Sequence, residues 1–337
     1  MPLEIIDDAD LSSRLSLRLR ARIERLIRVH HPAELQEARQ AVRRPFRGVL
    51  GEGSNSVFGT RVGGTLVQVA WGGLHRRDDR CIEAGAGVAW DDLVGWSLSQ
   101  GLCGLENLSM IPGSVGAAPV QNIGAYGVEL AECLESLDAF NWLTGETRCF
   151  DRSDCSFGYR DSVFRKHGAE HWIILRLRLR LRPLRKADDL RLTHPDLAAA
   201  FAQRAPACAD EVADAVRRIR AGKLPDPALY PNAGSFFHNP RVAADKAGEL
   251  LEREPGLVHA PDRSGSVKLS AAWMIERCGL KGLRSGNVGV SGQHALVLVN
   301  YGRATGEELI SFADQVRGAV EQRFGVPLSI EPRVVLS

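Results

Sequence analysis

The chain has 337 residues, more than one domain usually holds, so two or three packed units are expected. Apolar residues make up 44% and charged residues 25%, as in globular proteins and unlike disordered or fibrous ones. The 43 Lys and Arg nearly balance the 41 Asp and Glu, and a net charge of +2 is too small to indicate a protein that binds nucleic acid or a membrane surface.

The sequence carries no signal for export, membrane insertion or metal binding. Its seven cysteines, from Cys81 to Cys278, form no CxxC pair, which argues against a disulfide framework and a zinc site. The first ten residues are acidic where a signal peptide is basic, and no eighteen apolar residues run unbroken. We therefore expect a cytoplasmic protein without a bound metal.

Short sequence patterns predict helices and strands mixed along the whole chain. Strands and tight turns are expected over 14–29, 46–58, 65–73, 81–90, 134–142, 171–182, 294–300 and 327–336, and helices over 31–42, 91–102, 210–224, 270–280 and 305–325. The stretch 183–206 is polar and rich in Pro, Asp and Ala, and the sequence KLPDP ends the helix that follows it. A domain boundary is expected there.

The predicted strand 171–182, HWIILRLRLRLR, alternates Leu with Arg. Alternation at period two gives one buried Leu face and one solvated Arg face. We prefer this interpretation to a nucleic-acid-binding or scaffold surface, which the arginines by themselves leave open.

Two glycine-rich segments are candidates for ligand binding. GEGSN, residues 51–55, follows an apolar strand, and its small residues can present backbone N–H groups to an anion, although an ordinary turn fits these five residues equally well. The segment 111–127, IPGSVGAAPVQNIGAYG, holds four glycines and two prolines, which predicts a structured loop without regular structure. Its polar members can hydrogen-bond a flavin edge or a pyrophosphate, or serve a purely structural loop.

Two single residues carry candidate chemistry. Arg160 in FGYRDS offers a fork that suits a carboxylate, and the alternative is a surface ion pair with Asp161. Ser235 in NAGSFFHNP places a small hydroxyl against two aromatic residues, and the alternative is a turn serine. No GxSxG motif surrounds Ser235, so the sequence does not support hydrolase chemistry.

A set of motifs, in their order along the chain, resembles the UDP-N-acetylenolpyruvoylglucosamine reductases. The motifs are GEGSN, GLENLSMIPGSVGAAPVQNIGAYGVE, FGYRDSVF, KLPDP, NAGSFFHNP, GSVKLSAAWMIERCGLKG, HALVLVN and IEPRVV. The resemblance covers 49–335, and the long stretch between FGYRDS and KLPDP is similar to the type I branch, which carries an extra loop over the substrate.

The resemblance implies an α+β protein with an FAD-binding fold of the vanillyl-alcohol-oxidase (PCMH) type in two subdomains, followed by a separate α/β substrate-binding domain. The expected boundaries are 14–185 for the FAD-binding domain, split near 70–80, 186–222 for a connecting segment with the substrate loop and a helix, 223–326 for the substrate-binding domain, and 327–337 for a C-terminal strand that brings Glu331 to the active site.

The resemblance also implies the site residues. The family's catalytic positions match Arg160, Ser235 and Glu331. Non-covalent FAD is expected at Gly51, Glu52, Gly53, Ser54, Asn55, Pro112, Gly113, Ser114, Gly116, Gln121, Asn122, Ile123, Gly124 and Arg220. The substrate is expected at Tyr159, His194, Lys223, Asn239, Lys281 and His294.

The implied reaction is the reduction of a UDP-linked enolpyruvyl amino sugar to UDP-N-acetylmuramate in a monomeric enzyme of peptidoglycan precursor synthesis, with NADPH as co-substrate. Hydride passes from NADPH to the flavin and from flavin N5 to the vinyl carbon. Arg160 and a protonated or hydrogen-bonded Glu331 hold the substrate carboxylate and stabilise its enolic form. Ser235 returns a proton to the neighbouring carbon.

The chain departs from the family pattern at three places. The usual Asn-Thr near the start is replaced around Ser16 to Arg18, in a region of early flavin contacts. His194 stands where the type I loop has a tyrosine, and its flat ring can still stack on the uridine. The sequence VSGQ before HALVLVN leaves open whether Gln293 or His294 contacts the pyrophosphate.

The main alternative function is that of another flavoenzyme of the same cofactor fold, which oxidises a sugar or phenol with dioxygen. That alternative predicts a covalent flavin link through His or Cys and needs no Ser235. A nucleic-acid-binding or scaffold protein would bind no flavin at all.

Overall fold

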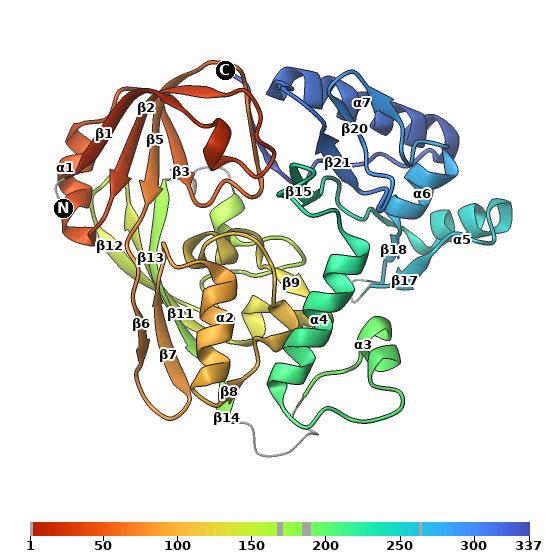
Figure 1. Cartoon of the computed structure of the whole chain (residues 1–337), viewed down its shortest axis with the longest axis horizontal. Coiled ribbons are helices and arrows are strands. Elements are labelled where there is room, and N and C mark those ends of the chain that lie inside the picture. Colours follow the sequence, from red (N-terminus) through yellow and green to blue (C-terminus); the bar gives the residue numbers. More distant parts are fainter. Residues whose placement is uncertain (1–2, 167–170, 184–189, 263–264) are drawn as a thin grey trace. The chain divides into compact units, whose positions relative to one another are not determined.

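A computed structural model of the chain describes residues 3–166, 171–183, 190–262 and 265–337 (Figure 1). The chain separates into two compact units. The first comprises Met1–Ala9, Ile23–Glu52 and Gly63–Arg220, and the second comprises Asp10–Arg22, Gly53–Val62 and Ala221–Ser337. The long C-terminal segment of the second unit starts at Ala221, and residues 14–22 and 53–62, which were expected in the FAD-binding domain, belong to the second unit.

The first unit begins with a four-stranded sheet in the order β1-β2-β5-β3. Its strands are β1 (Glu4–Asp10), β2 (Arg22–Val29), β3 (Phe46–Leu50) and β5 (Val62–Val69), and the short helices between β2 and β3 are η2 (Pro32–Glu34) and α1 (Leu35–Gln40). β3 and β5 run parallel. Ile27, Val67 and Trp71 belong to the buried cluster between this sheet and its neighbours.

The second sheet of this unit has five strands in the order β12-β11-β13-β7-β6, paired antiparallel (Figure 1). They are β6 (Leu74–Arg76), β7 (Cys81–Gly85), β11 (Leu134–Asn141), β12 (Thr147–Asp151) and β13 (Trp172–Arg180). The helices α2 (Trp90–Ser99), α3 (Pro195–Ala200) and α4 (Ala209–Lys223) accompany it. Side chains of β11, β13, α2, α3 and α4 share one apolar core.

Short elements connect these parts of the first unit. They are β8 (Leu102–Cys103), η3 (Glu106–Leu108), η4 (Val115–Gln121), β9 (Gly124–Ala125), β10 (Val128–Glu129), η5 (Leu130–Glu132), η6 (Val163–Arg165) and β14 (Arg182–Pro183). The segment 111–127, expected to lack regular structure, thus contains a seven-residue 3-10 helix and a strand. This helix accommodates Pro119, which has no N–H to donate. The hydrogen bonds at its C-terminal end are donated by Asn122 and Ile123 to the carbonyl oxygens of Pro119 and Ala118.

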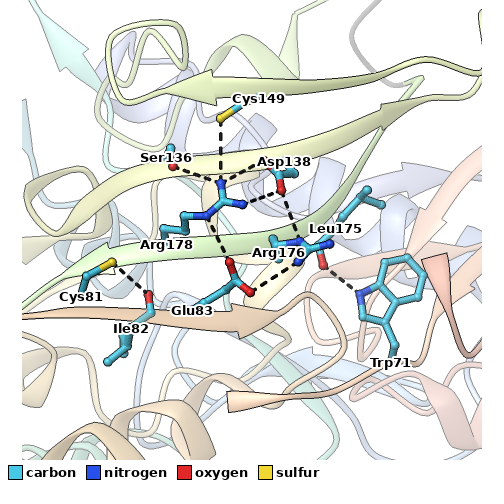
Figure 2. A network of polar contacts seen from close by, with 10 residues as sticks. All are labelled: Trp71, Cys81, Ile82, Glu83, Ser136, Asp138, Cys149, Leu175, Arg176 and Arg178. Carbon is cyan, nitrogen blue, oxygen red and sulfur yellow. Dashed lines mark hydrogen bonds and ion pairs between the residues drawn. The ribbon is translucent and has the colours of Figure 1, made fainter. Parts of the chain in front are cut away.

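The Leu/Arg alternation in β13 gives the two faces that the sequence predicts. Leu175, Leu177 and Leu179 are buried, whereas Arg176 and Arg178 lie on the opposite face. There the arginines meet acidic residues of neighbouring strands, as Figure 2 shows. The arginine face is therefore largely neutralised within its own sheet and does not form an uncompensated basic patch.

The second unit is built around the sheet β15-β21-β20-β19. Its strands are β15 (Asn232–Ser235), β19 (Arg284–Ser285), β20 (Val288–Val290) and β21 (Val297–Asn300); a smaller sheet contains β16 (Arg241–Val242), β17 (His259–Pro261) and β18 (Val267–Leu269). The helices are η1 (Ser12–Arg14), α5 (Ala244–Arg253), α6 (Ala271–Arg277) and α7 (Gly306–Phe324). α7 begins after a Thr305 capping box and ends at Gly325 in the left-handed conformation.

Contacts between distant parts of the sequence explain why residues 10–22 and 53–62 belong to the second unit. β22 (Arg333–Val335) pairs in parallel with β4 (Ser56–Phe58). The buried amide of Asn300, at the end of β21, donates to the carbonyl oxygens of Leu17 and Arg18 at 2.9 and 3.2 Å. These long-range bonds have no local signature in the sequence.

Candidate functional site

The turn 51–55 lies at the end of β3, as the sequence predicts. Its first two residues belong to the first unit and its last three to the second unit. In the first unit, the Glu52 carboxylate accepts a hydrogen bond from the Gly113 N–H at 3.1 Å, and a Cβ on Gly51 would lie 2.9 Å from the Ser114 hydroxyl oxygen. Burial raises the pKa of Glu52, although the bond from Gly113 lowers it. The first half of the turn is therefore packed against the loop that follows Pro112.

In the second unit, the other half of this turn is held by residues near the start of the chain. The Ser16 N–H donates to the Gly53 carbonyl oxygen at 3.2 Å, and the Ser16 hydroxyl donates to the Ser54 carbonyl oxygen at 3.1 Å. Gly53 has a φ of +65°, and a Cβ there would lie 2.1 Å from the Arg14 carbonyl oxygen. The Asn55 carbonyl oxygen accepts the Arg333 N–H at 3.0 Å. Ser16, at a departure from the family pattern, thus supports the turn.

The loop 112–124 packs closely on the chain that follows β7. The Trp90 N–H donates to the Gly113 carbonyl oxygen at 2.8 Å, and the Gly116 N–H donates to the Ala86 carbonyl oxygen at the same distance. A Cβ on Gly116 would lie 2.7 Å from the Ala86 Cβ, so the close approach requires glycine. Gln121 is half-buried and ends η4, while Ile123 is buried.

Arg160 lies next to this loop in the first unit. Its Nη2 donates to the Gly124 carbonyl oxygen at 2.8 Å, and its guanidinium lies 5.7 Å from the centre of the Tyr159 ring. The carbonyl oxygens of Gly158 and Asp161 accept each other's N–H at 3.3 and 3.0 Å. Asp161 is exposed, and the Arg160 side chain turns to the glycine loop.

Arg220, near the end of α4, adds a second guanidinium. Desolvation lowers the pKa of Arg220; the charge of Arg160 also lowers it, while Tyr126 and Asp91 oppose the shift. Its Nε is buried and has no hydrogen-bond partner within the described parts of the chain. A buried cation beside a second cation fits an anionic group such as a phosphate or the electron-rich edge of a flavin.

His194 precedes α3 and caps it, because its Nδ1 accepts the Asp196 N–H at 3.3 Å. Its ring lies edge-on to Tyr126 at a centroid distance of 4.9 Å. The Asn107 side chain holds the backbone next to these two rings. Its amide donates to the carbonyl oxygens of Tyr126 and Arg191 at 2.8 and 2.9 Å. Asn107 and Tyr126 lie in quoted motifs, but the sequence gave them no role.

Ser235 and Glu331 lie on adjacent segments of the second unit. Ser235 ends β15 opposite Val297. The next residue, Phe236, accepts the Glu331 N–H through its carbonyl oxygen at 2.9 Å. The Glu331 carboxylate lies 3.6 Å from Nδ1 of His238, and both side chains are largely buried. His238 stands in NAGSFFHNP, and its place opposite Glu331 could not be found from the motif alone.

The remaining predicted substrate residues also lie in the second unit. Lys223 ends α4, Lys281 forms an ion pair with Glu276 at 3.1 Å, and the Asn239 side chain accepts the Ala271 N–H at 3.0 Å. Burial lowers the pKa of His294, and the charges of Lys223 and Lys281 lower it further while Glu276 opposes them.

The structure bears on the choice between Gln293 and His294. Gln293 is exposed, whereas His294 is half-buried and within the electrostatic reach of Lys223 and Lys281. The His294 Nδ1 accepts the Leu296 N–H at 3.2 Å, so the neutral ring carries its proton on Nε2 and offers it as a donor. This arrangement favours His294 as the anion-contacting residue.

A cavity of about 260 Å³ lies elsewhere in the first unit, lined among others by Cys103, Cys133, Arg180 and Arg191. None of the predicted site residues lines it. Glu132 and Glu135 bind Arg191 and Arg180, so the charges in its wall are largely paired.

Two sequence models of known families match the chain. A C-terminal domain of UDP-N-acetylenolpyruvoylglucosamine reductase matches residues 226–335, and an FAD binding domain matches residues 23–149. A UDP-N-acetylenolpyruvoylglucosamine reductase from Azoarcus sp. strain BH72 is 48% identical, with 98% of each chain covered. The chain belongs to the UDP-N-acetylenolpyruvoylglucosamine reductase family.

Other members of this family agree over the full length. The enzyme of that name from Pseudomonas aeruginosa is 42% identical, with 99% of this chain and 100% of the relative covered. The crystal structure of UDP-N-acetylenolpyruvylglucosamine reductase from Thermus caldophilus superimposes with a TM-score of 0.68 at 26% identity over 99% of each chain. The expected α+β fold, with an FAD-binding part and a separate C-terminal domain, is confirmed. The family is one of FAD-binding oxidoreductases.

No helix among the described residues is both long and apolar enough to cross a bilayer. Within the same residues, no group of three or more His, Cys, Asp or Glu is arranged to hold a metal ion.

Proposed function

We propose that this protein reduces UDP-N-acetyl-3-O-(1-carboxyvinyl)glucosamine to UDP-N-acetylmuramate with NADPH, as a cytoplasmic monomer in peptidoglycan precursor synthesis. The observation that carries the proposal is the match of 48% identity along 98% of both chains to a relative of that name. The site residues inferred from sequence also stand in surroundings that suit their proposed roles.

The cofactor of this reaction is non-covalent FAD, which when bound supplies the hydride relay between NADPH and the substrate. We assign its phosphates to the turn Gly51 to Asn55 and its ring to the loop that contains Pro112 to Gly116 and Gln121 to Gly124. Arg220 supports this assignment, because its Nε is buried and lacks a hydrogen-bond partner among the described residues. An anionic cofactor group offers the partner that this Nε lacks.

Arg160 binds the substrate carboxylate in this proposal. Its guanidinium is oriented by a hydrogen bond to the Gly124 carbonyl oxygen, and a guanidinium can bind a carboxylate through two parallel N–H donors. A fixed cation stabilises negative charge that develops on the carboxylate and the adjacent carbon when the double bond is reduced. Tyr159, packed beside Arg160, contacts the same substrate.

Ser235 donates the proton that completes the reduction. A serine hydroxyl is a weak acid, so it needs a fixed position and a neighbour that can replace the proton. The backbone provides the fixed position, because β15 pairs with β21 at Ser235 and Val297. Glu331 joins Arg160 in binding the substrate carboxylate, which requires a proton or a hydrogen-bond donor on the Glu331 side chain.

Four residues of the second unit bind the UDP part of the substrate. Lys223, Lys281 and the Nε2–H of His294 supply donors for the diphosphate, and Asn239 adds an amide. In the first unit, the flat ring of His194 stacks on the uracil. Its edge-on contact with Tyr126 holds the ring at the site where the family's type I loop has a tyrosine.

Substrate-dependent oxidation of NADPH tests this function. The purified holoprotein is mixed with NADPH, with and without the UDP-linked enolpyruvyl substrate, and the NADPH absorbance and the product mass are recorded. The proposal predicts fast oxidation only with the substrate, together with UDP-N-acetylmuramate as product. Oxidation at the same rate in both samples, with dioxygen consumed, would instead identify an oxidase.

A further inference from the structure

Arg160 holds an unusual backbone conformation. Its φ is +54°, in the left-handed region that only glycine and, to a lesser degree, Asn and Asp adopt easily. It is the third residue of the tight turn that is closed by hydrogen bonds between Gly158 and Asp161. Such a conformation costs an arginine about 1 kcal/mol or more, so the surroundings have to hold it in place.

Two buried side chains connect this turn to the glycine loop. The Ser162 hydroxyl donates to the Val120 carbonyl oxygen at 2.6 Å, and the Asn122 amide donates to the Gly158 carbonyl oxygen at 3.0 Å. Ser162 is 0% and Asn122 is 1% exposed. The bond from Asn122 therefore fixes the backbone two residues before Arg160, and the bond from Ser162 fixes it two residues after Arg160.

Neither side chain has an N–H or O–H donor left for a ligand. The Ser162 oxygen also accepts the Phe164 N–H at 3.2 Å, so its single proton is directed to Val120. The second Asn122 amide proton goes to Glu129 at 3.0 Å, and the Asn122 oxygen accepts the Ala131 N–H at 3.0 Å. Asn122 itself has a φ of +43°, so its side-chain bonds also fix its own backbone.

We propose that Ser162 and Asn122 are positioning residues that hold the Arg160 turn in the left-handed conformation and so set the direction of its guanidinium. This inference rests on the proposed function, in which Arg160 binds the substrate carboxylate. It changes the role of Asn122 from a side chain that contacts flavin to one that acts through Arg160; its backbone remains part of the flavin loop. The Arg160 bond to the Gly124 carbonyl oxygen then depends on both residues.

The Ser162→Ala variant removes one bond without adding volume. Rapid mixing separates the reduction of the flavin by NADPH, which does not use Arg160, from its reoxidation by the enolpyruvyl substrate, which does. We expect an unchanged reduction rate and a reoxidation rate that is lower by about tenfold, since a small misplacement of a binding group costs up to about a hundredfold. Ser153→Ala, at an exposed serine of the same region, is the matched control and should leave both rates unchanged.

A double-mutant comparison distinguishes positioning from general damage. If Ser162 acts through Arg160, Ser162→Ala has no further effect on reoxidation in an Arg160→Ala background. An equal loss in both backgrounds, an equal loss in both half-reactions, or no loss in Ser162→Ala would overturn the proposal. Asn122→Gly, which tolerates the positive φ but lacks the amide, is the second variant, and it should slow reoxidation in the wild-type background but not in the Arg160→Ala background.

Crystal structures of the wild type and Ser162→Ala give a readout that needs no activity. The proposal predicts an Arg160 φ in the left-handed region in the wild type, and in the variant either another φ or a guanidinium that has left the Gly124 carbonyl oxygen. An unchanged Arg160 in the variant would contradict it. If the wild type does not turn over the substrate, the proposed function fails, and this structural comparison still decides the positioning role.

Discussion

The backbone N–H of Glu331 donates to the carbonyl oxygen of Phe236 at 2.9 Å, which joins the near-terminal glutamate to the residue beside Ser235. Phe237 and Ile330 form a bridge next to this bond, and the His238 N–H donates to the Ser329 carbonyl oxygen at 2.9 Å. Two segments that lie far apart in the sequence therefore run side by side. The structure of the second unit thus keeps two of the proposed catalytic residues in a fixed relation.

Glu331→Gln tests the role of this carboxyl group. The amide keeps the size but cannot carry the proton or the charge that faces His238 at 3.6 Å. We expect kcat for substrate reduction to fall by about a hundredfold, in the range found when one stabilising donor is removed from an active site, while flavin reduction by NADPH stays unchanged. Glu321→Gln, at an exposed position of α7, is the control. A loss in both half-reactions would argue against a specific role.

His294 predicts a pH dependence of substrate binding. Burial and the charges of Lys223 and Lys281 lower the pKa of His294, so the ring is neutral in the free protein at neutral pH. The diphosphate brings negative charge and favours the protonated ring, so binding takes up a proton and the Kd falls as the pH decreases. Calorimetric titration with a UDP-linked amino sugar between about pH 8 and about pH 6 measures this effect in the range where histidine titrates.

The His294→Gln variant is the control for that measurement. Glutamine retains an N–H donor but does not titrate, so the Kd of this variant for the same UDP-linked amino sugar should vary little over the same pH range. The lysines remain charged throughout, and the diphosphate of UDP sugars has no further proton to lose there. The same pH dependence in both proteins would show that another group binds the proton.

Asp138→Asn tests the polar network on the arginine face of the five-stranded sheet (Figure 2). Asp138 binds Arg178 through two hydrogen bonds of 2.8 and 3.0 Å. Burial acts to raise the pKa of Asp138, but Arg178 and Arg176 outweigh it and the pKa is lowered. Breaking this largely buried pair should reduce the free energy of unfolding by about 2 kcal/mol at neutral pH.

The sign of the pH effect follows from the lowered pKa. The carboxylate stabilises the fold above its ordinary pKa of 3.8, and this contribution is lost as the pH falls through its lower value in the folded protein. Urea unfolding at neutral pH and below pH 3.8 should therefore show a smaller difference between the wild type and Asp138→Asn in acid. Asp151→Asn, at an exposed site of β12, is the control. A constant difference would contradict the ion-pair account.

Asn107→Ala tests the backbone support next to the His194 ring. The variant removes two hydrogen bonds, to the carbonyl oxygens of Tyr126 and Arg191, from a fully buried position. Two unsatisfied carbonyl groups should cost about 2 kcal/mol or more of stability. Because Tyr126 contacts His194, we also expect a higher KM for the UDP substrate with little change in kcat. An unchanged KM would separate Asn107 from substrate binding.

Local sequence signals predict the elements that carry their own caps and periodicity. The Thr305 capping box and Gly325 bracket α7, and KLPDP ends α4 at Lys223. β1 (Glu4–Asp10) was not predicted, because its acidic sequence EIIDDAD has no strand pattern. It forms an edge strand beside β2, where Arg25 binds Asp7 and Arg28 binds Glu4, so its stability depends on partners from another segment.

The candidate site shows the same division. The motifs point to Arg160, Ser235 and Glu331 through resemblance, because each stands in a recognisable short sequence. Neighbours of these residues, such as Ser162 and His238, contact partners that are distant in the sequence, at Val120 and Glu331. Periodicity and composition carry no information on such pairs, so only the three-dimensional structure identifies them.

The most direct test of the central claim measures the two half-reactions of Ser235→Ala by rapid mixing. In the wild type, NADPH reduces the flavin and the enolpyruvyl substrate reoxidises it. If Ser235 returns the proton to the substrate carbon, the variant is reduced by NADPH at the wild-type rate but is reoxidised by the substrate at least a hundredfold more slowly, as expected for loss of a general acid. Equal reoxidation rates in the two proteins would contradict the account.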